Sequence, residues 1–126
     1  MCQQLFKRKV VMPTNFELIK GYIQNTPLKP MAAKYNPPGG TPGGNGVRWL
    51  WPHVLGTSPI PGSMSEEEVV LCNQYHPPAF AGWKCLKVLH LTDIQDVPGT
   101  PPSPDDDLTA VELQRQSCVL TIVASR

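Results

Sequence analysis

The sequence predicts a small α+β fold, a single irregular domain in which short helices and two or three strands are separated by long loops. Two observations lead to this class. The 126 residues include 15 prolines and 10 glycines, which interrupt helices and central strands, so long regular elements are not expected. Between these breakers, short hydrophobic segments alternate between helical and strand-like spacing.

The first section, residues 1–35, is a basic segment with one expected helix. Thr14 is followed three residues later by Glu17, which is the spacing of a capping box. Ile19 and Ile23 then recur at helical spacing. We expect a helix over residues 15–25.

The second section, residues 36–62, contains six prolines and seven glycines and is expected to be an extended linker. It includes one apolar island, in which Trp49 and Trp51 flank Leu50 and follow Arg48. This island is expected to form an edge strand or a segment that binds other molecules through its apolar side chains. Tryptophans beside an arginine can stack on bases or on proline, but buried tryptophans that anchor a small core are commoner, and we favour that interpretation. As the alternative, Arg48, Trp49 and Trp51 are candidate partner-binding residues.

The third section, residues 63–126, is expected to be a small α+β unit. A second capping box and a run of glutamates predict a helix over residues 66–75, which ends before consecutive prolines. Residues 83–91 and 118–124 are rich in apolar and β-branched side chains and predict strands. A further short helix is expected after the acidic residues 105–107. We expect the core to lie in residues 66–75, 83–91 and 117–124.

Charge is distributed unevenly along the chain. Residues 1–63 contain seven Lys or Arg and one Glu, a net charge of +6, and residues 64–126 contain four Lys or Arg and nine Asp or Glu, a net charge of −5. The basic half suggests an anionic partner such as nucleic acid. Alternatively, the two halves neutralise each other within one fold.

The chain is expected to be intracellular, either cytoplasmic or nuclear. Its first residues lack the uninterrupted apolar stretch of a secretory signal, and no window approaches the ~20 apolar residues of a membrane helix. The four cysteines are widely spaced, unlike those of a disulfide-rich secreted domain. We therefore expect reduced thiols and no membrane partner.

One set of residues has metal-ligating chemistry: Cys72, His76, Cys85 and His90. On the expected helix, Cys72 and His76 are four residues apart and share a face. Cys85 and His90 are five residues apart on an expected strand and point to opposite faces. The alternative interpretation is two buried cysteines and two ordinary surface histidines. We expect no resident cofactor, with zinc as the alternative.

The chain shows no catalytic signature. It contains three histidines, and no local motif pairs any of them with a nucleophile and an orienting group. We do not expect an enzyme.

A proline-rich segment offers a different kind of site. Pro98, Pro101 and Pro104 have the minimal spacing of polyproline ligands. Thr100 and Ser103 precede prolines and are candidate phosphorylation sites.

Three functional hypotheses follow. The first is a non-enzymatic interaction or regulatory protein that binds another protein through its proline-rich segments and an apolar, tryptophan-containing surface. The second is a zinc-dependent nucleic-acid-binding module that uses the basic half. The third is a young or unselected reading frame without an evolved biochemical activity.

Overall fold

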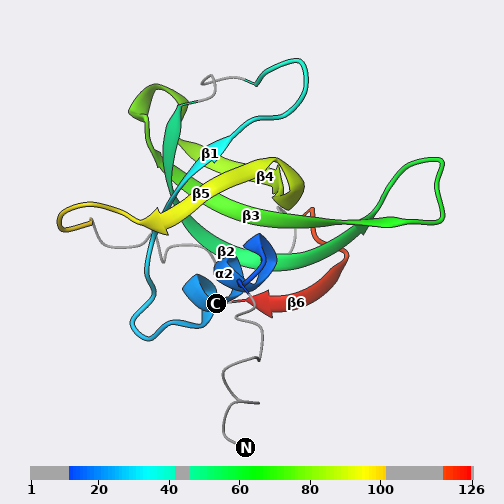
Figure 1. The fold of residues 1–126 in the computed structure, drawn as a ribbon, viewed down its shortest axis with the longest axis horizontal. Coiled ribbons are helices and arrows are strands. Elements are labelled where there is room, and N and C mark those ends of the chain that lie inside the picture. The colour runs from blue at the N-terminus through cyan, green and yellow to red at the C-terminus, as the bar shows by residue number, and fades with distance from the viewer. Residues whose placement is uncertain (1–11, 42–45, 102–117, 126) are drawn as a thin grey trace, which may run out of the picture.

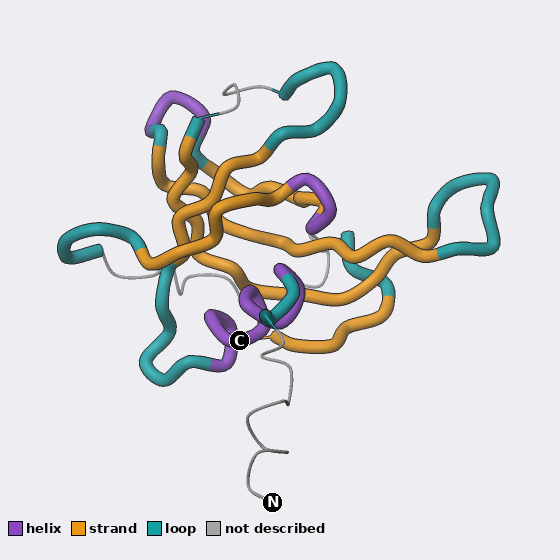
Figure 2. Tube along the Cα trace, viewed as in Figure 1, coloured by secondary structure: helices purple, strands orange, loops and turns teal. Residues whose placement is uncertain are grey.

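The computed structural model describes residues 12–41, 46–101 and 118–125. Its elements are one α-helix, six strands and two single-turn 3-10 helices (Figures 1 and 2). In chain order they are α2 (Asn15–Gln24), β1 (Met31–Tyr35), β2 (Val47–Pro59), β3 (Glu66–His76), η1 (Pro78–Phe80), β4 (Gly82–Lys87), η2 (Val88–His90), β5 (Leu91–Asp96) and β6 (Thr121–Ser125).

The expected α+β class is wrong, because the domain is mostly antiparallel sheet. Strands make up about half of the described residues, and α2 is the one α-helix among them. Five strands follow the order β4-β3-β2-β1-β5, and β6 pairs with β2. In Figure 1, α2 crosses one side of this sheet, and the β2–β3 hairpin projects beyond the rest of the domain.

The helix over residues 15–25 is confirmed. The Thr14 hydroxyl accepts a hydrogen bond from the Glu17 backbone N–H at 3.2 Å, which caps the first turn of α2. Ile19 and Ile23 are buried on one side of α2 and pack into the main core.

The helix expected over residues 66–75 is instead strand β3. Val70 and Cys72 belong to one hydrophobic core, and Val69 and Leu71 belong to a second core on the opposite face of the sheet. Successive side chains of a strand point to opposite faces, so a continuous apolar run with two buried faces suits a strand. Pairing with β2 and β4 therefore outweighs the local capping signals, which are worth only about 1 kcal/mol.

The expected linker over residues 36–62 contains the longest strand, β2. Residues 47–50 of β2 pair with β1, and residues 54–57 pair with β6 along the same side. Pro52 lies between these two stretches, and on the other side of β2 it is paired with Cys72 of β3, next to a register shift between Pro52 and Val54. A proline is tolerated beside such an irregularity, and for this reason it does not end the strand.

The two remaining strand predictions are partly confirmed. The segment 83–91 is split by η2 into β4 and β5, and β5 continues to Asp96 to pair with β1. The expected C-terminal strand is present as β6. The helix expected after residues 105–107 lies outside the described residues.

The sheet has a buried core on each side. The main core lies against α2 and contains Ile19, Ile23, Met31, Ala33, Tyr35, Leu50, Leu55, Val70, Cys72, Leu86, Val88, Leu91 and Ala124. The second core lies on the other face and contains Val54, Val69, Leu71 and Val119, with Trp83 and Cys118 packed against it. The three segments expected to hold the core contribute to it, but so do α2, β1 and the expected linker, in which Leu50 and Leu55 are buried, so the expected division into linker and core is wrong.

Oppositely charged residues from the two halves of the chain meet at the sheet edge formed by β1 and β5. Lys29 lies 3.1 Å from Asp96, and Lys34 lies 3.4 Å from Asp93. These pairs are largely exposed, so each contributes little stability. Within the described ranges, no helix has the length and apolar character needed to cross a membrane.

Candidate protein-interaction surface

The two candidate tryptophans pack on one face of β2, among aromatic side chains of β3. The Trp49 ring stacks on the His76 ring, with 4.2 Å between centroids. Trp51 and Tyr75 lie 6.1 Å apart. Trp51 is only 3% exposed, and burial also raises the pKa of the Tyr75 hydroxyl. The cluster is therefore mainly part of the packing of the domain, with Trp49 half-buried at its margin.

Arg48 does not share a surface with these tryptophans. It is 2% exposed and donates a hydrogen bond to the Gln74 side-chain oxygen at 3.1 Å. Its guanidinium carbon also lies 5.3 Å from the centre of the Tyr35 ring. Burial lowers the pKa of Arg48 from its ordinary value. The expected apolar surface around Arg48, Trp49 and Trp51 is thus divided between two environments, both mostly buried.

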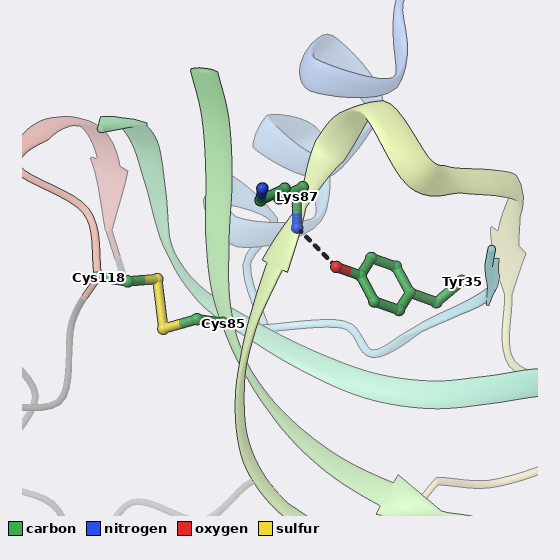
Figure 3. Close-up of a disulfide and its surroundings, with 4 residues drawn as sticks. All are labelled: Tyr35, Cys85, Lys87 and Cys118. Atoms are coloured by element: carbon green, nitrogen blue, oxygen red, sulfur yellow. Dashed lines mark hydrogen bonds between the residues drawn. A yellow bond between two sulfur atoms is a disulfide. The ribbon is translucent and has the colours of Figure 1, made fainter. Parts of the chain in front are cut away.

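The four zinc-competent residues are not gathered into one site. Cys85 forms a disulfide with Cys118 (Figure 3), so the expectation of reduced thiols is wrong for this pair. Cys72 is buried in the main core, and that burial raises the pKa of its thiol.

The two histidines of this set pack against aromatic rings. The His76 ring lies against Trp49, and His90 contacts Tyr35 edge to face at 6.2 Å. No group of three or more His, Cys, Asp or Glu residues close enough to hold a metal occurs in the described part of the chain. The structure therefore does not assemble the donor set on which the zinc alternative depends.

The proline-rich segment follows β5. Pro98 and Thr100 are exposed, and Pro101 is half-buried. Ser103 and Pro104 lie outside the described residues. The structure therefore places one candidate phosphorylation site, Thr100, on the surface.

Two of the outer strands carry charged side chains. β5 contains Asp93 and Asp96, and β4 contains Lys84 and Lys87. The Lys87 backbone N–H also donates a hydrogen bond to the Tyr35 hydroxyl at 3.3 Å (Figure 3). Charges and satisfied backbone groups are common protections of strand edges against pairing with other chains.

Strand β6 differs from both, because it has no charged residue and its two large apolar side chains are exposed. Ile122 is 53% exposed and Val123 is 46% exposed, and Leu120, directly before β6, is 71% exposed. The register with β2 shifts between Leu55 and Gly56, which makes Val123 an extra residue in a β-bulge. Two consecutive apolar side chains are therefore at the surface. We call Leu120, Ile122 and Val123 the β6 patch.

Two buried residues on opposite faces of the sheet hold β6 in place. Val119, before the strand, is 5% exposed and contributes to the second core, and Ala124 is 5% exposed and contributes to the main core. The Leu120 backbone N–H donates to the Thr57 carbonyl oxygen at 3.0 Å. Sequence reasoning identified this strand from its β-branched residues but missed the patch, because the outward side is decided by pairing with β2.

The chain shows no match to any protein-family model, to any curated protein or to any solved structure.

Proposed function

We propose that this is a non-enzymatic interaction protein that binds an extended segment of a partner polypeptide along strand β6. The observation that carries the proposal is the β6 patch, in which Ile122 and Val123 of the uncharged strand β6 and Leu120 directly before it are large, apolar and exposed. Exposed apolar patches of this kind often mark interaction sites.

The geometry of β6 supports an extended partner. Within the described ranges, β6 pairs with β2 and with no other strand, so its outer backbone groups have no strand partner there. An extended peptide can add to such an edge through backbone hydrogen bonds, while side-chain contacts supply specificity. The bulge at Val123 limits the length of regular pairing, and the neighbouring Leu120 and Ile122 supply apolar contact area.

The contrast with the other outer strands supports this location. Both β4 and β5 carry charged residues, and Asp93 and Asp96 of β5 are in ion pairs with lysines of the basic half. Adding an apolar strand to either of these edges would remove charges from water, which is unfavourable. Strand β6 imposes no such cost.

The nucleic-acid alternative receives less support. Lys29 and Lys34 are paired with carboxylates, and Arg48 is buried. A nucleic-acid interface needs exposed cations gathered on one face, because phosphate contacts supply most of its affinity.

The proposal is tested by selecting peptides from a random phage-displayed library on the disulfide-intact protein. We expect the selected peptides to be uncharged and rich in β-branched residues. Their affinity should fall at least tenfold in an Ile122→Lys variant, because a charge would then be buried at the interface. Met64→Lys is the matched control, because Met64 is fully exposed at the turn of the β2–β3 hairpin and its substitution should leave binding unchanged.

The location is checked by amide hydrogen exchange with the selected peptide bound. Slower exchange should be confined to β6 and its neighbours. If no peptide is enriched, or if enriched peptides bind both lysine variants equally well, the proposal is wrong.

A further inference from the structure

We infer that the Cys85–Cys118 disulfide regulates the β6 patch, because it fixes to the sheet a strand that has few other attachments. This inference rests on the proposed function of β6. It concerns the oxidation state of the chain and makes partner binding dependent on it.

The disulfide connects two outer strands that do not pair with each other. Cys85 lies on β4, and Cys118 lies three residues before the start of β6 (Figure 3). Their Cα atoms are 6.1 Å apart, and the bond closes a loop across 33 positions of the chain. It therefore joins the residues just before β6 to β4, the strand that pairs with β3 on the side away from β2.

The other attachments of β6 are limited. It pairs with β2 at four positions, over residues 54–57, and it also contacts α2. Val119 and Ala124 are its buried apolar residues, whereas the larger side chains of the β6 patch lie outside. A strand with few buried apolar contacts opens at low free-energy cost, so the covalent link decides how often β6 is in place.

The bond is positioned to react with a reductant. Cys85 is an exposed residue, and Cys118 is half-buried. The remaining described cysteine, Cys72, is buried in the main core, while the disulfide lies beside the second core on the opposite face. Within the described residues, no third cysteine lies on their face of the sheet to exchange with them.

The reductant we name is a dithiol. One of its thiolates attacks the Cys85 sulfur, which breaks the sulfur–sulfur bond and releases Cys118 as a thiolate that takes up a proton. The second thiol of the reductant, as its thiolate, then attacks the reductant sulfur of the mixed disulfide and releases Cys85, which is also protonated. Two electrons pass to the protein disulfide, and the reductant becomes a disulfide.

The effect of this reaction follows from the length of the closed loop. In the chain-entropy description, opening a loop of this size lowers the equilibrium for keeping its ends together by about 500-fold. Part of this 500-fold change affects the local equilibrium between β6 paired with β2 and β6 detached from it. Reduction should therefore detach β6 from β2, so that the residues of the β6 patch no longer form an ordered surface.

The experiment compares oxidised protein, protein treated with dithiothreitol, and a Cys85→Ser/Cys118→Ser double variant. Amide exchange without any ligand is measured first. We expect exchange over residues 121–125 to be at least tenfold faster in the reduced protein and in the double variant. Exchange over residues 69–72 of β3 should remain slow, which shows that the sheet is still folded. A Cys72→Ala variant should respond to dithiothreitol as the wild type does.

The second measurement is the affinity of a peptide selected on the oxidised protein. We expect it to bind at least tenfold more weakly to the reduced protein and to the double variant. If exchange over residues 121–125 or peptide affinity is unchanged by reduction, while Ile122→Lys still lowers the affinity at least tenfold, the redox inference is wrong and the proposed function stands. If Ile122→Lys has no effect on binding, the proposed function fails, and the inference that depends on it fails too.

Discussion

Replacing Gly56 by alanine tests how closely β6 packs on β2. A Cβ atom at this position would lie 2.6 Å from Cγ1 of Val119 and 2.9 Å from the carbonyl carbon of Thr121, and it would overlap the carbonyl oxygen of Thr121. The backbone there is held by pairing with Thr57 and by the hydrogen bond from Leu120. The methyl group can therefore be accommodated only if β6 moves away from β2.

The expected cost can be worked out from what that movement breaks. Overpacking typically costs about 1–3 kcal/mol, and losing the burial of one valine side chain costs about 1.5–3 kcal/mol. Removing a glycine from a strand returns about 0.5–1 kcal/mol. Because relaxation replaces one of the two penalties by the other, and removing the glycine offsets part of it, we expect Gly56→Ala to lower the free energy of unfolding by about 1.5 kcal/mol.

The matched control is Gly21→Ala. Gly21 lies on the exposed side of α2, and a Cβ atom there meets nothing within 4 Å. The same substitution should raise the free energy of unfolding by about 0.5–1 kcal/mol, because alanine is the better helix former. Urea unfolding of both variants, with the disulfide intact, measures the two changes. A neutral or stabilising Gly56→Ala would refute the close approach of β6 to β2.

Three further predictions concern the sulfur chemistry and the charged edge. Replacing both Cys85 and Cys118 by serine should lower the free energy of unfolding by about 4 kcal/mol in urea titrations, from the loop that the disulfide closes; a loss below about 1 kcal/mol would contradict this. The hydrogen bond that the Tyr22 hydroxyl donates to Asp96 at 2.7 Å is the main reason that the pKa of Asp96 is lowered. Because the pKa of Asp96 is lower in the folded state, this group stabilises the fold above its unfolded pKa, near pH 4, and the stabilisation is lost as the pH falls through the folded pKa. Tyr22→Phe should therefore raise the Asp96 pKa in an NMR titration and reduce the loss of unfolding free energy in acid. Burial raises the pKa of the Cys72 thiol, so iodoacetamide should label Cys72, as mapped by mass spectrometry, only when the domain opens; rapid labelling of the folded protein would show that Cys72 is accessible.

Burial was predicted for part of the core and missed in the expected linker, where Leu50 and Leu55 are buried. The apolar residues of segments 66–75 and 83–91 were assigned to the core, and Val70, Leu71 and Leu86 are buried. The tendency to leave water is a property of each side chain, so composition reveals it. Whether a short apolar run forms a helix or a strand depends on how many of its faces are covered, and that is settled by neighbours distant in sequence.

The candidate site was predictable only in part. The strand-like character of the C-terminal segment comes from its own β-branched residues. The exposure of Ile122 and Val123 follows from the bulge in the pairing with β2, and the bond between Cys85 and Cys118 follows from the way the sheet brings β4 and the start of β6 together. Four cysteines allow several pairings, and spacing along the chain does not choose among them.

The sequence by itself determined helix α2 and the apolar core positions of segments 66–75 and 83–91. The cap of α2 forms between Thr14 and Glu17, three residues apart, so no distant contact is needed to specify it. Only the tertiary structure decided that β2 runs through Pro52, that β3 is a strand, and that the β6 patch faces outward. Each of these outcomes depends on which backbone groups find partners across the sheet, and such pairing is a property of the folded chain as a whole.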